Sequence, residues 1–458
     1  MRIALVAPNA QAHTVVQPLG LGYLAASIRQ DGHEVRIFDL ARDDSDPETG
    51  ARAAASWKPD LLGVSVLSTT FLSAREFLAE FRRLSPGVKV IAGGPHVTSI
   101  PSSFSDLGAD LGMVGESELS LRQLAASLEK GDPLEDVPGL CRRENGSVVV
   151  NPQGERVYDL DALGFPAWDL MDPGTYPDKP SQILHQNFPV AIITTSRGCA
   201  YDCSFCASTT LWGKRLRWRS PEDVVDEIEL LVGEYGVQEI HFMDDSFTQK
   251  ASHARAVCEE ILRRGIRTSW ACTNGVRIDS LDDGLLGLMR SAGCFSVGLG
   301  LESGSQRVLD LNRKKLDLSL VPERVRMIKS HGIATHGFFI IGLPGETRET
   351  VRETLKLSRS LSLDRANFTL MAPLPGSDLY RKYIEEAGKE PDYESFKFFT
   401  PFPVGEMSTR ELKRWQRRAV FGFYLRPRQV WNTARSIRMS QLRDVFRTVM
   451  DYTWRYNG

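Results

Sequence analysis

Short apolar runs alternate with helical stretches through two long segments of this chain, residues 1–145 and 189–385. In the first segment the runs RIALVAP, HEVRIFDL, DLLGVSVLS, VKVIAGG and DLGMVGE are separated by amphipathic stretches such as residues 18–31 and 73–84. Buried strands that alternate with helices are typical of a parallel sheet with helices on both faces. Residues 1–145 are therefore expected to form a doubly wound α/β domain, whose ligands bind beyond the carboxyl ends of the strands.

The second segment repeats the alternation six times, from VAIITTSRG at residues 190–198 to RANFTLMAPLPG at residues 365–376. Six strand–helix units predict an open (β/α)6 barrel over residues 189–385, with its active face at the carboxyl ends of the strands. Residues 146–188 are rich in Pro, Asp and Gly and are predicted to be a linker. Residues 386–458 lose the alternation and are expected to form a helical, basic C-terminal region.

Three of the seven cysteines, Cys199, Cys203 and Cys206, lie together in TTSRGCAYDCSFCAS, directly after the first barrel strand. This spacing can supply three thiolates to an iron–sulfur cube, which usually needs four. One iron would then be free to bind a substrate or cosubstrate. A structural zinc site is the alternative, with a fourth ligand from elsewhere in the chain. The candidates for that ligand are Cys141, Cys258, Cys272 and Cys294.

The segment GCAYDCSFC resembles the cluster loop of the radical S-adenosylmethionine (SAM) enzymes. The resemblance implies that Cys199, Cys203 and Cys206 ligate a [4Fe–4S] cluster, and that the open iron binds the amino and carboxylate groups of SAM. It also implies that Phe205 packs beside the cluster and the adenine of SAM.

Further strand ends resemble the SAM-binding positions of the same family. Asp244 and Asp245 end the second barrel strand, and by resemblance they receive the SAM ammonium group, although helix capping or a salt bridge would also explain them. Glu302 ends the fourth strand, where a buried acid is costly without a partner, and would contact the ribose or amino acid part of SAM. Gly342 begins GLPGET, whose backbone would lie against adenine, while Glu346 could cap the next helix.

The N-terminal region resembles the cobalamin-binding domain that precedes many radical SAM domains. The matching segments are PLGLGYLAASIRQDGHEV, SVLSTT, GGPH and VGESE. The resemblance implies that the hydroxyl-rich loop faces the corrin and that the glycine turn admits the nucleotide tail, because glycine has no side chain in the way. His96 is either a ligand contact or a surface histidine. The residues expected to contact cobalamin are Ser65, Ser68, Thr69, Gly93, Gly94, His96 and Glu116.

One motif of some cobalamin domains, DxHxxG, is missing. The corresponding stretch reads Asp39-Leu40-Ala41-Arg42-Asp43-Asp44, without the histidine that would ligate cobalt from below. If cobalamin binds, its cobalt therefore has no ligand from this position, which suits methyl transfer. The alternative is a domain that keeps the fold and has lost the cofactor.

Composition limits the partners of the chain. A net charge of −2 gives no general reason to expect nucleic acid, and no apolar run approaches the length of a membrane span. Seven cysteines in 458 residues do not suggest a disulfide scaffold, so a reducing cytoplasm is expected. The arginines and aromatic residues of the C-terminal region fit either a lid on the barrel or peripheral contact with an anionic membrane.

Together these features resemble the cobalamin-binding radical SAM enzymes, class B methyltransferases among them. The resemblance implies reductive cleavage of SAM to a 5′-deoxyadenosyl radical and methylation of an unactivated carbon in a small-molecule, lipid or tetrapyrrole-like substrate. An external electron donor of the flavodoxin or ferredoxin type would be needed. The alternatives are radical oxidation, cyclisation or rearrangement without methyl transfer, or a non-catalytic zinc, electron-transfer or corrinoid-carrier protein.

Overall fold

The computed structural model of the chain describes residues 1–9, 15–178, 185–389, 392–394 and 402–436. These residues belong to two compact units. Unit 1 comprises Met1–Pro177, Ala207–Arg217 and Leu374–Phe398, and unit 2 comprises Asp178–Cys206, Trp218–Pro373 and Phe399–Gly458.

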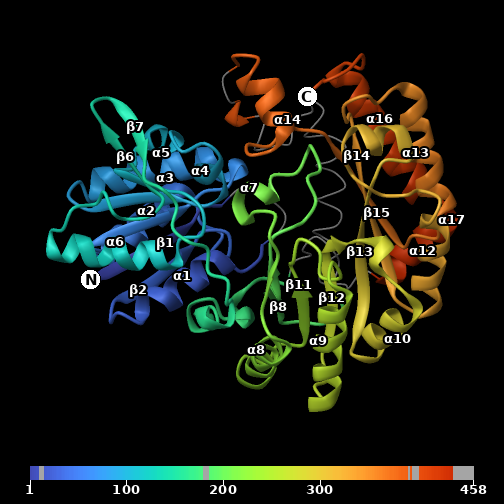
Figure 1. Cartoon of the computed structure of the whole chain (residues 1–458), viewed down its shortest axis with the longest axis horizontal. Coiled ribbons are helices and arrows are strands. Elements are labelled where there is room, and N and C mark those ends of the chain that lie inside the picture. Colours follow the sequence, from blue (N-terminus) through green and yellow to red (C-terminus); the bar gives the residue numbers. More distant parts are fainter. Residues whose placement is uncertain (10–14, 179–184, 390–391, 395–401, 437–458) are drawn as a thin grey trace. The chain divides into compact units, whose positions relative to one another are not determined.

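Unit 1 contains a seven-stranded sheet in the order β2-β1-β3-β4-β5-β6-β7 (Figure 1). Its strands are β1 (Arg2–Ala7), β2 (Glu34–Asp39), β3 (Leu61–Ser65), β4 (Lys89–Gly93), β5 (Leu111–Met113), β6 (Leu140–Glu144) and β7 (Ser147–Val150). Strands β1 to β5 pair in parallel, and β6 and β7 add an antiparallel edge. The parallel part is the doubly wound sheet that the sequence predicted, and β7 lies in the stretch assigned to the linker.

In unit 1, helix α1 packs against α6, and helix α2 packs against α3. The helices are α1 (Leu19–Arg29), α2 (Pro47–Ser56), α3 (Phe71–Leu84), α4 (Pro95–Ser99), α5 (Ser103–Asp106), α6 (Glu118–Lys130), α7 (Ser208–Trp212) and α14 (Asp378–Tyr380). Helix α2 begins at Pro47 because Asp46 caps it: the Asp46 side chain accepts a 2.8 Å hydrogen bond from Thr49 N, and proline suits the first helical position.

Unit 2 contains a six-stranded parallel sheet in the order β15-β14-β13-β12-β11-β8 (Figure 1). Its strands are β8 (Val190–Ile193), β11 (Glu239–Phe242), β12 (Ser269–Val276), β13 (Cys294–Glu302), β14 (Ala334–Ile341) and β15 (Arg365–Leu370), with two short strands at β9 (Ser196–Arg197) and β10 (Arg217–Trp218). The predicted partial (β/α)6 barrel is confirmed, strand for strand.

The helices of unit 2 connect these strands and cover the outer face of the sheet. They are α8 (Pro221–Glu234), α9 (Ala251–Arg264), α10 (Asp283–Ser291), α11 (Gln306–Leu311), α12 (Val321–Ser330), α13 (Arg348–Ser360), α16 (Thr409–Tyr424) and α17 (Pro427–Ser436). Helix α8 begins at Pro221, as its sequence predicts, because the Ser220 side chain accepts a hydrogen bond from Asp223 N.

Helix α16 belongs to the basic C-terminal region and packs on β15. Trp415 and Phe423 are buried, and the Tyr424 hydroxyl donates to Ala366 O at 2.9 Å. These aromatic residues therefore cover the barrel. Residues 437–458, with Arg438, Arg443, Arg447 and Trp454, lie outside the described part of the chain. None of the helices in the described part combines the length and apolarity that crossing a bilayer requires.

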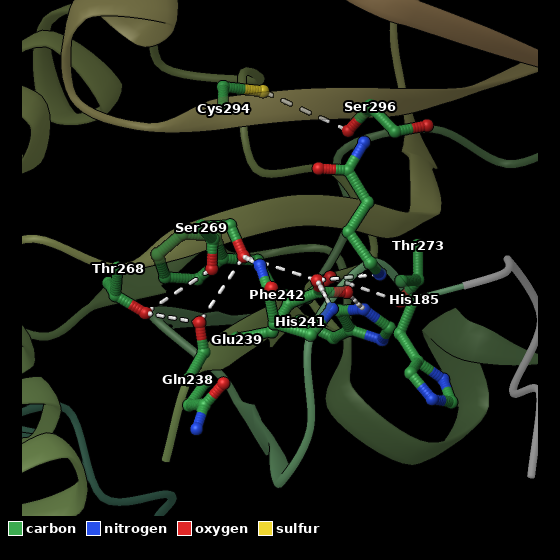
Figure 2. Close-up of polar contacts among 12 residues, drawn as sticks. His185, Gln238, Glu239, His241, Phe242, Thr268, Ser269, Thr273, Cys294 and Ser296 are labelled. Atoms are coloured by element: carbon green, nitrogen blue, oxygen red, sulfur yellow. Dashed lines mark hydrogen bonds and ion pairs between the residues drawn. The ribbon is translucent and has the colours of Figure 1, made fainter. Parts of the chain in front are cut away.

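A buried polar network lies at the amino end of β11 (Figure 2). The Glu239 carboxylate accepts hydrogen bonds from Gln186 N at 2.8 Å, Asn187 N at 2.9 Å and Ser269 Oγ at 3.1 Å, and His241 Nε2 lies 2.7 Å from it. Glu239 and His241 are fully buried. The network attaches residues 186–187, which precede β8, to strands β11 and β12. It lies at the amino ends of the strands, opposite to the carboxyl ends that are expected to carry the chemistry.

Candidate functional site

The cysteine loop follows β8 and β9 in unit 2. None of its three cysteines forms a disulfide with a described residue; Cys199 and Cys203 are half-buried and Cys206 is exposed. Cys206 N donates to Cys203 O at 3.0 Å, which folds the loop back on itself. Asn312 anchors the loop, because its carbonyl oxygen accepts from Ser204 N at 3.1 Å and its side chain accepts from Ser204 Oγ at 2.9 Å. Phe205, beside this anchor, is half-buried.

The loop is the only place in the described ranges where three cysteines follow one another so closely in sequence. Within those ranges, no group of three or more His, Cys, Asp or Glu side chains is placed to hold a single metal ion. The four other cysteines are buried, in β6, α9, β12 and β13. Burial raises the pKa of the Cys199 and Cys203 thiols, so iron would be needed to keep both as thiolates.

Glu302 ends β13 with a left-handed backbone, φ 59°, and is buried. Its partner is Lys314, whose Nζ lies 2.7 Å from Glu302 Oε1. Burial by itself lowers the pKa of Lys314, but the Glu302 carboxylate and the Cys203 thiolate outweigh it and raise that pKa. Lys314 is therefore a half-buried cation beside the cysteine loop, which its sequence did not predict.

Gly300 makes room for this ion pair. A Cβ atom at Gly300 would lie 2.9 Å from both Glu302 Oε1 and Lys314 Nζ. The turn that carries Lys314 is strained, because the flanking residues Arg313 and Lys315 both have a positive φ.

Arg277 holds the same turn in place. Its guanidinium donates to the carbonyl oxygen of Lys314 at 3.1 Å and to that of Lys315, pairs with Asp279, and lies 3.9 Å from the ring centroid of Tyr201. The Arg277 side chain is thus held by partners of its own chain.

Asp244 and Asp245 have different surroundings. The buried Asp244 carboxylate accepts hydrogen bonds from Thr195 N at 3.0 Å and Thr195 Oγ1 at 2.8 Å, and another from Ser196 Oγ. Burial raises the pKa of Asp244, and these hydrogen bonds act in the opposite direction. Asp244 therefore joins β11 to the segment that enters the cysteine loop. Asp245 is half-buried, and its charge contributes to the raised pKa of Cys199.

The GLPGET segment closes on itself after β14. Gly342, with φ 97°, donates its N–H to Glu346 Oε2 at 2.5 Å. Glu346 is buried, which raises its pKa to about 7, and its Oε1 has no hydrogen-bond partner in the described part of the chain. The expected capping role for Glu346 is wrong, because Thr347 caps α13 by accepting from Thr350 N.

In unit 1 the hydroxyl-rich loop and the glycine turn lie side by side. Val66 N donates to Gly93 O at 2.9 Å, and a Cβ atom at Gly94, with φ 90°, would lie 2.9 Å from Ser65 Oγ. Ser65, Ser68 and Thr69 are half-buried, so their loop is accessible to a ligand. The turn conformation requires glycine at position 94, as its sequence suggested.

His96 is fully buried, so the alternative of a surface histidine is wrong. Its Nδ1 lies 2.9 Å from Ser68 Oγ, and its Nε2 has no partner within the described residues. The Phe71 ring lies 4.9 Å away, and burial lowers the pKa of His96 to about 4. His96 is therefore a neutral imidazole, and its contact with Ser68 Oγ holds the Ser68 side chain in place.

Glu116 is engaged by a residue far along the chain. Arg217, also buried and also in unit 1, pairs with both carboxylate oxygens of Glu116, at 2.8 and 2.5 Å, and donates to Val157 O. This bidentate pair secures residues 207–217, the segment that follows the cysteine loop in sequence.

Two family models match the chain: the B12 binding domain over residues 6–125 and the Radical SAM superfamily over residues 193–358. An uncharacterized methyltransferase of Pyrococcus horikoshii, PH0819, is 31% identical, with 93% of each chain covered. The anaerobic magnesium-protoporphyrin IX monomethyl ester cyclase of Rubrivivax gelatinosus is 29% identical, over 91% of this chain and 77% of its own. The fold is similar to that of TsrM from Kitasatospora setae, a radical SAM methyltransferase, with a TM-score of 0.71, 24% identity, and coverage of 85% and 77% of the two chains.

Proposed function

This chain belongs to the cobalamin-binding radical SAM enzymes, and we propose that it methylates an unactivated carbon of a small-molecule substrate. The observation that carries the proposal is the match to a methyltransferase along 93% of both chains, with both cofactor domains present. Three cysteines on one loop, none of them in a disulfide with a described residue, support it, as does the half-buried Lys314 cation beside that loop.

The cofactors of the proposal are a [4Fe–4S] cluster, SAM and cobalamin. When bound, the cluster delivers an electron to SAM and cobalamin supplies the methyl group. Cys199, Cys203 and Cys206 would hold the cluster. The positive charge of Lys314 would offset thiolate charge next to Cys203, and Asn312 would hold the loop in place.

For SAM, we infer contacts from Asp245, Glu302, Phe205 and the Gly342 backbone. Asp244 would act through Thr195 and Ser196, because its carboxylate is occupied by their hydrogen-bond donors. Glu302 would keep one oxygen for Lys314, and the other would be available to a ligand.

For cobalamin, we infer contacts from Ser65, Ser68, Thr69 and the Gly93-Gly94 turn. His96 would orient Ser68, and Glu116 would hold the segment after the cysteine loop through Arg217. Asp39 does not replace the missing histidine, because its carboxylate accepts from the Tyr176 hydroxyl at 2.8 Å and from Ala41 N at 3.1 Å.

The proposal requires an external one-electron donor of the flavodoxin or ferredoxin type and a reducing compartment, for which the cytoplasm is the natural setting. We also propose peripheral contact with an anionic membrane. Four large apolar side chains are exposed between residues 421 and 431, at the junction of α16 and α17: Phe421, Leu425, Val430 and Trp431. Arginines accompany them, among them Arg418, which lines a groove between α13 and α16 with Arg352, Lys356 and Arg359.

A second candidate function is radical cyclisation or oxidation without methyl transfer, favoured by the 29% identity to the protoporphyrin ester cyclase. Anaerobic incubation with SAM, reductant and cobalamin separates the two. Methylation yields S-adenosylhomocysteine together with 5′-deoxyadenosine, while the second candidate yields 5′-deoxyadenosine alone.

A further inference from the structure

The two faces of the barrel sheet differ at β14 and β15. On one face Phe339 and Phe368 stack at 5.2 Å, and Phe423 of α16 covers them. Side chains alternate along a strand, so the intervening residues point to the opposite face. That face carries His336 on β14 and, on β15, Arg365 and Asn367, and the strand register pairs His336 with Arg365.

This opposite face also bears the Glu302–Lys314 pair. The register pairs Gly298 with His336 and Gly300 with Phe338, and paired positions of parallel strands share a face. A Cβ atom at Gly300 would point at Glu302 and Lys314. His336, Arg365 and Asn367 therefore lie on the inner face of the barrel, in the amino-terminal halves of β14 and β15 and deeper than the strand ends.

His336 is only 4% exposed, and neither of its ring nitrogens has a hydrogen-bond partner in the described part of the chain. Burial lowers the pKa of His336 to about 4, the charge of Arg365 adds to this effect, and the nearby Asn367 side chain acts in the opposite direction. The ring is neutral at pH 7, with one donor and one acceptor unsatisfied. Buried polar groups in that state are uncommon and call for a ligand or water.

The Arg365 side chain makes no hydrogen bond or ion pair with any described residue. The nearest acid in sequence, Asp364, is already bound by Lys329 at 2.6 Å and by Thr335 N at 2.8 Å. Burial lowers the pKa of Arg365, which remains a cation. Asn367 is exposed on the same face, so the position is open to a ligand. A half-buried guanidinium without an anion is costly, and an anionic ligand would remove that cost.

We propose that His336, Arg365 and Asn367 form a binding site for a carboxylate group of the substrate. The proposal rests on the proposed function and adds a substrate class, the carboxylic acids. A planar guanidinium matches the two oxygens of a carboxylate by parallel hydrogen bonds. The neutral imidazole and the amide can each donate a further hydrogen bond, and the amide can also read a neighbouring polar group.

Succinate is a suitable probe, with uncharged succinamide as its matched control. Binding to the reconstituted holoprotein, without reductant, is followed through ring signals of isotope-labelled histidine, with His336→Gln assigning the signal of His336. A saturable shift of that signal with succinate is expected at roughly millimolar concentrations, and no such shift with succinamide. Inorganic phosphate at equal ionic strength should shift it less, because a planar carboxylate fits the fork better.

Arg365→Gln should weaken succinate binding by at least about tenfold, the loss expected when a charge-assisted contact disappears. Arg365→Lys keeps the positive charge but loses the planar pair of N–H donors, so its affinity for succinate should lie between those of the unaltered protein and Arg365→Gln. Arg326→Gln, which removes an exposed arginine of α12, should bind like the unaltered protein. The proposal is overturned if the His336 signal does not respond to succinate, or if it responds equally to succinamide or more strongly to phosphate. It is also overturned if the response to succinate is unchanged in Arg365→Gln. Because no turnover is needed, these outcomes are independent of whether the protein methylates.

Discussion

The Lys314 ammonium group lies 2.7 Å from the Glu302 carboxylate beside the cysteine loop, where Glu302 is buried and Lys314 is half-buried. The Glu302 charge would be costly there alone, because it would lose water without gaining a partner. The carboxylate stands on a strained, left-handed backbone position, with φ 59°.

Removal of Lys314 should therefore destabilise unit 2. Lys314→Met leaves the Glu302 charge buried and unpaired, with an expected cost of about 3–5 kcal/mol in unfolding free energy. Glu302→Gln in the same chain should recover a large part of that cost, because the unpaired charge is gone. Chemical denaturation of the two single variants and the double variant measures the coupling. Strictly additive effects would show that the two side chains do not interact.

A side chain at Gly300 should disturb the ion pair of Glu302 and Lys314. Gly300→Ala would place a methyl group 2.9 Å from both charged atoms, so the pair must separate and the melting temperature and the iron content should fall. Gly233→Ala is the matched control, because it lies in α8, where an added Cβ atom would meet no other atom within 4 Å. That variant should gain about 0.5–1 kcal/mol from the lower entropy of alanine. Equal behaviour of the two variants would contradict the packing described for Gly300.

Glu346 predicts a pH effect on stability. Burial raises its folded pKa from 4.5 to about 7, so the folded state binds the proton more tightly than the unfolded state. The contribution of Glu346 to the free energy of unfolding is therefore fully present below about pH 4.5. It falls by about 2–3 kcal/mol as the pH rises towards 7. Glu346→Gln keeps the acceptor for Gly342 N without the charge. It should be more stable than the unaltered protein at pH 8 and similar at pH 5, as thermal unfolding at both values would reveal. A constant difference across this range would show that Glu346 does not titrate there.

The membrane proposal predicts binding to vesicles that contain phosphatidylglycerol and little binding to pure phosphatidylcholine. Leu425→Glu should abolish co-sedimentation, because it places a charge in the exposed apolar group, and added salt should weaken binding by screening the arginines. Leu84→Glu, at an exposed leucine of α3 in unit 1, is the control and should bind normally. Equal binding to both lipids, or by both variants, would remove the support for membrane contact.

The sequence predicted the two strand–helix alternations because strands buried on both faces are continuous apolar runs. It also placed Cys199, Cys203 and Cys206 on one loop, since their spacing alone brings them together. Lys314 was missed because nothing local distinguishes a buried lysine from a solvated one. The Glu116–Arg217 pair was missed for a related reason: its two members are 101 residues apart, and only the fold joins them.

His96 and Glu346 show the same limit in another way. GGPH and GLPGET marked the correct turns, but the burial that makes His96 neutral and raises the pKa of Glu346 arises from packing by other elements. His336 and Arg365 read as ordinary strand residues, and only the register of β14 and β15 brings them together.

The most direct test of the account is product analysis after anaerobic reconstitution with iron, sulfide and cobalamin, followed by SAM and reductant. The unaltered chain should hold about four iron atoms and form 5′-deoxyadenosine and S-adenosylhomocysteine. Cys206→Ala should lose both products, while Cys258→Ala, at a buried cysteine of α9, should keep them. Zinc in place of iron, or undiminished 5′-deoxyadenosine from Cys206→Ala, would contradict the account.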